Sequence, residues 1–121
     1  MKEEEILKRR IENEERQEEN TEITMLLERK MENCGQLYAS ERHHNERVMA
    51  YFYRQEEGSF FEEIIEDARI EERRFFEEMT DGQETLAKNK RQLEEHSETL
   101  YEAELQALRE EEDAHGQNGD W

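Results

Sequence analysis

A heptad pattern of apolar side chains runs through the second half of the chain. Alternating steps of four and three residues from Phe61 stay on one face of an α-helix. Most of the fourteen positions reached are apolar, whereas hydrophobic residues make up 32% of the chain. They are Phe61, Ile65, Ala68, Glu72, Phe75, Met79, Gly82, Leu86, Asn89, Leu93, His96, Leu100, Ala103 and Ala107. We call this row the seam, and it predicts a long helix that packs against a partner helix.

The first half carries a weaker version of the same pattern. From Thr24, the same stepping passes through Leu27, Met31, Cys34, Tyr38, Glu41, Asn45, Val48, Phe52 and Gln55, which we call the seam positions of the first helix. It predicts a first helix over about residues 3–55, which continues through Gly35. Apart from Met1, residues 1–22 hold only three large apolar side chains, Ile6, Leu7 and Ile11. We therefore expect this end of the helix to fray when no partner is bound.

Helix stop and start signals meet at Gly58 and Ser59. Gly58 fits a C-terminal cap, because glycine adopts the left-handed conformation freely. Ser59 fits an N-cap, and Glu62, three residues later, completes a capping box. These signals predict a turn at about residues 56–59 and a second helix over about residues 60–110. A single helix that continues through Gly58 is the alternative.

The predicted fold class is all-α, an elongated antiparallel helical hairpin resembling a coiled coil. Folding the chain at Gly58 places Tyr38 opposite Met79, Cys34 opposite Gly82 and Asn20 near His96. Residues 1–110 then form one hairpin, and residues 111–121 form a flexible acidic tail. Trp121 at the end of this tail is either an unburied residue or a docking anchor.

Charge restricts the classes of partner. The net charge is −18, and 43% of the residues are charged. Nucleic acids and anionic membrane surfaces attract basic proteins, so we expect neither as a partner. The chain contains one cysteine and no long apolar run of the kind found in transmembrane helices or signal peptides. We therefore expect a cytoplasmic protein without disulfides.

Residues suited to catalysis or metal binding are few and lack the necessary spacing. Cys34 and the four histidines, His43, His44, His96 and His115, form no metal-binding motif. Glutamate pairs at helical spacing are expected on helices so rich in glutamate, and they do not by themselves indicate acid–base catalysis. We predict that the protein is not an enzyme and binds no cofactor or metal.

Several apolar residues of the second helix lie outside the seam, including Phe60, Ile64, Ile70, Phe76, Tyr101 and Leu105. A two-helix hairpin covers about one stripe on each helix, so these side chains predict a second, partner-binding surface. The partner-binding residues that we predict are Phe60, Phe61, Ile64, Ile65, Phe75, Phe76, Met79, Leu86, Leu93, Leu100 and Tyr101.

Four segments of the second half, residues 58–65, 71–75, 83–93 and 98–101, resemble a known family. The chain is WXG-like in its predicted shape, but the WXG-type proteins of type VII secretion carry a Trp-x-Gly motif that its turn lacks. It more closely resembles the small α-helical helper proteins encoded beside LXG-domain toxins in Gram-positive bacteria, specifically the second of their two classes.

This resemblance implies a role in toxin export by the type VIIb secretion system. The helper would bind the helical LXG domain of a toxin together with a sister helper of the first class. The export motif of that system is absent after the second helix, which implies that a partner supplies the signal. The helper would be cytoplasmic or exported together with the toxin.

Two other functions remain open. The chain could be a self-associating coiled-coil adaptor, in which Asn20, Asn45, Asn89 and His96 set the register of a homo-oligomer. It could also be an acidic chaperone for a basic client, although its negative charge is spread along both helices rather than concentrated in one tail.

Overall fold

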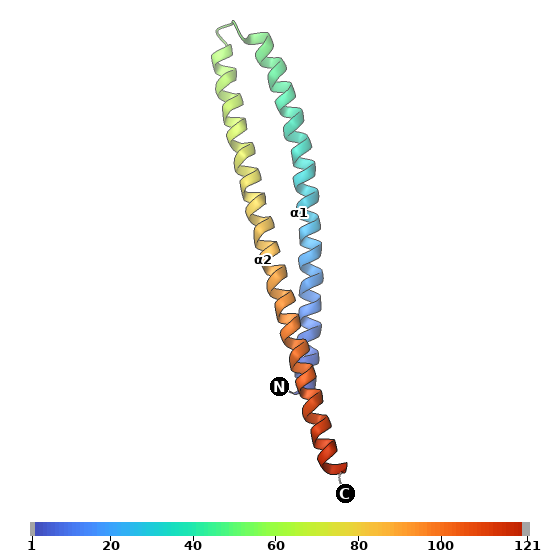
Figure 1. Ribbon diagram of the computed structural model, residues 1–121. Coiled ribbons are helices and arrows are strands. Elements are labelled where there is room, and N and C mark those ends of the chain that lie inside the picture. The colour runs from blue at the N-terminus through green and yellow to red at the C-terminus, as the bar shows by residue number, and fades with distance from the viewer. Residues whose placement is uncertain (1, 120–121) are drawn as a thin grey trace. The chain divides into compact units, whose positions relative to one another are not determined.

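The chain forms two long helices that pack against each other as a helical hairpin. The computed structural model describes the backbone of residues 2–119 and the side chains of residues 2–114. Helix α1 spans Glu3–Phe52 and helix α2 spans Gly58–Gly119 (Figure 1). The described residues contain no β-strand. The predicted all-α hairpin is therefore confirmed, and both helices continue through their internal glycines, Gly35 and Gly82.

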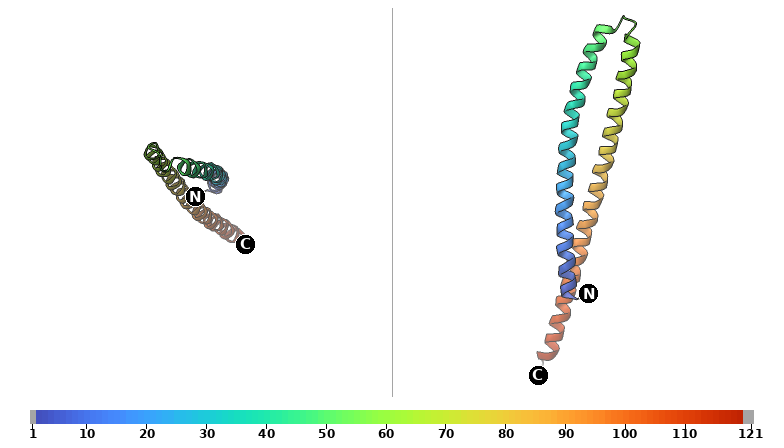
Figure 2. Two further views of the ribbon diagram at one scale, coloured as in Figure 1. Left: turned by 90° about the horizontal axis from the view of Figure 1, so that it is seen from above. Right: turned by 180° about the vertical axis from the view of Figure 1, so that it is seen from behind.

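Contacts between α1 and α2 fall into two units. The turn unit comprises Thr24–Thr85 and contains the connection between the helices. The terminal unit comprises the described residues up to Ile23 and from Leu86 onward. In each unit a segment of α1 packs against a segment of α2, and Figure 2 allows both segments to be followed from two further directions.

The connection between the helices lies earlier in the chain than expected. Helix α1 ends at Phe52 and α2 begins at Gly58, so residues 53–57 form the connection. The amide of Gly58 donates a hydrogen bond to the carbonyl of Gln55 at 3.0 Å, and the amide of Gln55 donates to the carbonyl of Phe52 at 3.0 Å. The predicted turn at residues 56–59 was therefore wrong by a few residues.

Gly58 and Ser59 do not have the predicted capping roles. No glycine among the described residues has a positive φ, so Gly58 is not a left-handed cap. It is the first residue of α2, and a Cβ atom there would lie 2.6 Å from the carbonyl oxygen of Phe52. The amide of Phe61 donates to the carbonyl of Glu57 at 3.1 Å, which places Glu57 at the N-cap and Ser59 inside the helix. Glycine is required here for close packing of the backbone rather than for its left-handed conformation.

The predicted seam is the face of α2 that packs against α1. Twelve of its fourteen positions are buried or half-buried, and Asn89 and His96 are the two exposed ones. On α1 the same stepping continues toward the N-terminus through Asn20, Asn13 and Ile6, whose exposed fractions are 8%, 3% and 2%. The periodicity of the sequence therefore identified the packing face correctly.

The predicted register between the helices was wrong. In the turn unit, Tyr38 lies against Phe75 and Phe76 instead of Met79, and Leu27 instead of Cys34 lies next to Gly82. In the terminal unit, the Asn20 amide reaches the Leu86 carbonyl, so Leu86 rather than His96 faces Asn20, although Asn20 and His96 line the same groove. The cause is the position of the connection: its middle residue is 55, three residues before the glycine at which we expected the chain to fold.

Helix α2 is longer than expected. It continues to Gly119, whereas the sequence predicted an end near residue 110 and a separate tail over residues 111–121. Residues 111–119 are therefore helical. The two expectations for Trp121 concern a residue outside the part that the structure describes.

Candidate protein-binding surface

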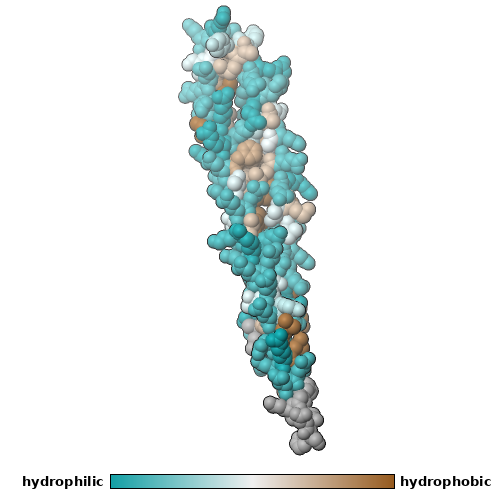
Figure 3. Space-filling view, in the orientation of Figure 1, coloured by the Kyte–Doolittle hydropathy of each residue, from teal (hydrophilic) through white to brown (hydrophobic). Residues whose placement is uncertain are grey.

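Large apolar side chains are exposed beside the connection in the turn unit. Tyr51, Tyr53, Phe60 and Ile64 expose 73%, 72%, 62% and 47% of their surfaces. We call Tyr51, Phe60 and Ile64, the three of these residues that lie within the helices, the turn patch. Figure 3 shows one face of the molecule, on which apolar side chains in brown interrupt a largely hydrophilic surface in teal. Exposed clusters of this kind mark sites of protein–protein contact.

Packing between aromatic rings holds the turn patch in place. The ring centroids of Phe52 and Phe61, both seam residues, lie 4.6 Å apart between the two helices. Tyr51 contacts Phe52 at 4.8 Å, and Phe60 contacts Phe61 at 5.7 Å. The outer rings therefore rest on an aromatic pair within the hairpin, and they present an ordered apolar surface to solvent.

The turn patch lies on one face of the hairpin. Tyr51, Phe60 and Ile64 each immediately precede a seam position. Arg42, Met49 and Arg69 each immediately follow a seam position, and they line a groove of about 120 Å³ between the helices. Because the side chains before and after a seam position point to opposite sides of a helix pair, the groove lies on the other face.

Three predicted partner-binding residues are largely used within the hairpin. Phe75, Phe76 and Met79 are half-buried. The ring of Tyr38 lies 5.5 Å from that of Phe75 and 5.9 Å from that of Phe76. Phe76 also fills the space beside Gly35, where its Cζ atom would lie 3.8 Å from an added Cβ. Phe61 and Ile65 are likewise half-buried, so Phe60 and Ile64 are the more accessible members of this part of the predicted site.

The predicted residues of the terminal unit divide in the same way. Leu100 exposes 2% of its surface, and Leu86 and Leu93 are half-buried. Tyr101 is 57% exposed, as expected for a residue beside the seam. Arg10 of α1 forms an ion pair with Glu104 of α2. Leu86, Leu93 and Leu100 therefore contribute to the hairpin, and Tyr101 is the accessible one.

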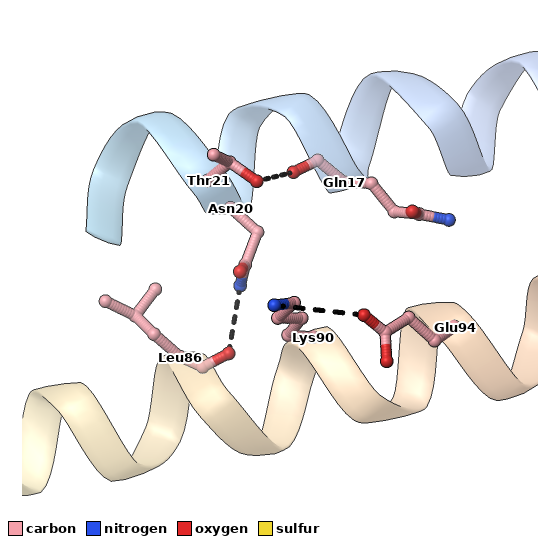
Figure 4. A network of polar contacts seen from close by, with 6 residues as sticks. All are labelled: Gln17, Asn20, Thr21, Leu86, Lys90 and Glu94. Atoms are coloured by element: carbon pink, nitrogen blue, oxygen red, sulfur yellow. Dashed lines mark hydrogen bonds and ion pairs between the residues drawn. The ribbon is translucent and has the colours of Figure 1, made fainter. Parts of the chain in front are cut away.

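Two buried asparagines join the helices of the terminal unit. The Nδ2 atom of Asn13 donates to the carbonyl of Leu93 at 3.1 Å, and that of Asn20 donates to the carbonyl of Leu86 at 3.2 Å (Figure 4). Gln17, between them on α1, donates to the Oδ1 atom of Asn13. Both asparagines and both leucines are seven residues apart, so the same contact repeats after one heptad. We call this pair of bonds the asparagine ladder.

The sequence contained a signal for the asparagine ladder. Asn20, Gln17 and Asn13 follow from Thr24 by continuing the four-three stepping backward. An open groove of about 460 Å³ lies beside Asn20, with Asn89 and His96 among its lining residues. The polar groups on both sides make the packing of this unit less apolar than that of the turn unit.

Groups with catalytic or metal-binding chemistry are not brought together in the described part of the chain. Cys34 is a half-buried free cysteine, and His43, His44 and His96 are exposed. Among the described residues, no three or more His, Cys, Asp or Glu side chains are placed to hold a metal ion. The side chain of His115 lies outside the described residues. Neither helix has, in its described part, a stretch long and apolar enough to cross a membrane.

The carboxyl group of Glu3 has a shifted pKa. A hydrogen bond with the side chain of Glu111, together with the negative charge of that residue, raises the pKa of Glu3. Desolvation and the charge of Glu104 act in the same direction. Glu3 is at the start of α1, so this cluster joins the two helices of the terminal unit.

Comparison with known proteins gives no relative from which a function could be transferred. No family model matches the chain, and neither characterised proteins nor solved structures gave a significant match. The function must therefore be argued from the surface of the hairpin.

Proposed function

We propose that the protein is a non-catalytic helper that binds the helical LXG domain of a secreted toxin. A sister helper joins the complex, which stabilises the toxin and promotes its export through a type VII system. The observation that supports this proposal most directly is the exposure of Phe60, Ile64 and Ile70, at 62%, 47% and 43%, along one helix. The resemblance of residues 58–65 to LXG helpers includes the first two of them.

The mechanism is packing of helices against the exposed side chains. A helix of the LXG domain lies along α2 and covers apolar groups that the hairpin leaves in water. Burying an exposed phenylalanine or isoleucine contributes roughly 1–2 kcal/mol to such an interface. Because the helper binds the folded toxin domain, it shifts the folding equilibrium of that domain toward the export-competent form.

The test is co-purification of the chain with an LXG domain encoded beside it. Phe60→Glu combined with Ile64→Glu should abolish binding, because each places a charge in the apolar contact. Met25→Glu is the matched control, since Met25 is 58% exposed and follows a seam position on the other face of the turn unit. Phe75 and Phe76 are unsuitable targets because both pack against Tyr38.

Two results would contradict the proposal. The first is unchanged capture of the LXG domain by the Phe60→Glu/Ile64→Glu variant. The second is a stable homo-oligomer that is indifferent to co-expressed LXG protein, which would favour the adaptor function. Binding that collapses with added salt would instead favour an acidic chaperone of a basic client, because apolar packing resists salt.

A further inference from the structure

The face that carries the turn patch has opposite charges on its two helices. In the turn unit, the residues immediately before the seam positions of α1 include Lys30 and Arg47 and no acidic residue. The corresponding residues of α2 include Asp67, Glu71, Glu78 and Asp81, with Arg74 as the exception. All of these side chains are exposed. We call the two sets the basic row and the acidic row.

The ion pairs within the turn unit do not include the charged residues of these two rows. Arg42 pairs with Glu72, and Arg69 pairs with Glu66 at 3.7 Å. Arg42, Arg69 and Glu66 follow seam positions, and Glu72 is a seam residue. The separation of charge on the turn-patch face is notable because the whole chain has a net charge of −18. An acidic protein that gathers basic side chains in one exposed row has a surface suited to an acidic partner.

We infer that a second copy of this chain covers the turn-patch face of the free protein, and that an LXG domain bound there would displace it. The two copies are related by a two-fold axis parallel to the helices, and their connections lie at the same end. The basic row of each copy then faces the acidic row of the other, and the four helix segments of the two turn units form a bundle. An isologous arrangement of this kind places every contact twice, so each favourable charge pair is also formed twice.

The register inside the hairpin specifies which residues meet in this dimer. Rotation about a two-fold axis parallel to the helices does not change the position of a residue along that axis. Phe52 contacts Phe61, and Arg42 contacts Glu72, so the two residues of each pair have the same position along the axis. Arg47 lies five residues beyond Arg42, and Asp67 lies five before Glu72, so Arg47 of one copy meets Asp67 of the other. By the same reasoning, the turn patches of the two copies meet beside the connections.

The competing two-fold arrangement places like charges together. If the connections lay at opposite ends, α2 would pack against α2 and bring Asp67, Glu71 and Glu78 of both copies into one interface. Like charges at such distances disfavour association, so the arrangement with connections at the same end is preferred. The exposed apolar side chains of Leu26, Leu37, Tyr51, Phe60 and Ile64 lie on this face, and aromatic and aliphatic groups of this kind form the centre of a stable interface.

The oligomeric state of the full chain tests the inference and does not depend on toxin binding. Sedimentation or light scattering should give about twice the 14.8 kDa chain mass at micromolar concentration. Tyr51→Glu combined with Phe60→Glu should give monomers that retain the helical circular dichroism spectrum. Ile70→Glu and Met25→Glu, which lie off this face, should remain dimeric. A monomeric wild-type chain, or a dimer that survives Tyr51→Glu/Phe60→Glu, would overturn the inference.

Charge exchange between copies tests the orientation. Arg47→Glu and Asp67→Arg should each weaken the homodimer by roughly tenfold, because each creates two like-charge contacts. A mixture of the two variants should form heterodimers with nearly wild-type affinity, since every pair in the mixed dimer is again of opposite charge. When both variants keep the helical circular dichroism spectrum of the wild type, failure of the mixture to recover affinity excludes this orientation.

Discussion

Alanine substitutions at three glycines should change stability in opposite directions. Gly35 and Gly82 lie inside helices, where a Cβ atom would meet Phe76 at 3.8 Å and Leu27 at 3.5 Å. Both are ordinary van der Waals distances. Alanine is more favourable than glycine within a helix by about 1 kcal/mol, so each substitution should raise the free energy of unfolding by about that amount. The two sites contact different residues, so the double variant should gain about 2 kcal/mol.

Gly58→Ala should have the opposite effect. Its Cβ would lie 2.6 Å from the carbonyl oxygen of Phe52, an atom of the backbone that cannot rotate away. The connection must shift to make room, and overpacking of this kind costs about 1–3 kcal/mol. This loss exceeds the gain in helix propensity, which is small in any case at the first position of a helix.

Urea unfolding followed by circular dichroism measures all three variants. Samples should have equal protein concentration, because association would add to stability. Ala39→Gly, at an exposed position of α1, is the control and should lose about 1 kcal/mol. The reasoning fails if Gly82→Ala lowers the urea midpoint or if Gly58→Ala leaves it unchanged.

Three further predictions concern polar contacts. Asn20→Leu should raise the free energy of unfolding by roughly 1 kcal/mol, because a buried amide gives way to an apolar side chain; a lower urea midpoint would contradict this. In a double-mutant cycle, Arg42→Ala and Glu72→Ala should couple by roughly 0.5–1 kcal/mol, and coupling that is unaffected by molar salt would refute an ion pair. The pKa of Glu3, followed by NMR, should be above the ordinary glutamate value and fall in Glu111→Gln. Because the folded pKa is raised, the stability from this contact is present below the ordinary pKa and lost as the pH rises through the raised value; an unchanged pKa in Glu111→Gln would exclude Glu111 as the cause.

The packing face could be predicted from the sequence because it depends only on periodicity. A side chain such as Leu93 or Met79 is assigned to the seam by its spacing, whatever it contacts. The burial of Asn13 and Asn20 follows from the same spacing, although their polarity argues against it. Their amides are satisfied by backbone carbonyls of α2, a contact that residue type alone does not specify.

The register could not be predicted because it depends on the backbone of the connection. Gly58 looked like a helix end, but the structure uses it as a helix start pressed against the Phe52 carbonyl. A displacement of three residues in the turn changes every facing pair, as Tyr38 shows by packing on Phe75 instead of Met79. Phe76 was assigned to the outer surface for a related reason. Its contact with the helix beside Gly35 depends on this register and on the missing side chain there.

The asparagine ladder opposes displacement of one helix segment of the terminal unit along the other, because the displacement breaks both of its hydrogen bonds. A slide by one or two residues would remove the amides of Asn13 and Asn20 from the carbonyls of Leu93 and Leu86 while both remained enclosed. Unpaired buried amides cost about 1–3 kcal/mol each. A slide by a full heptad returns an asparagine to a leucine position, since Leu86, Leu93 and Leu100 repeat every seven residues. The amides therefore create a barrier between the present register and the equivalent one about 10 Å away.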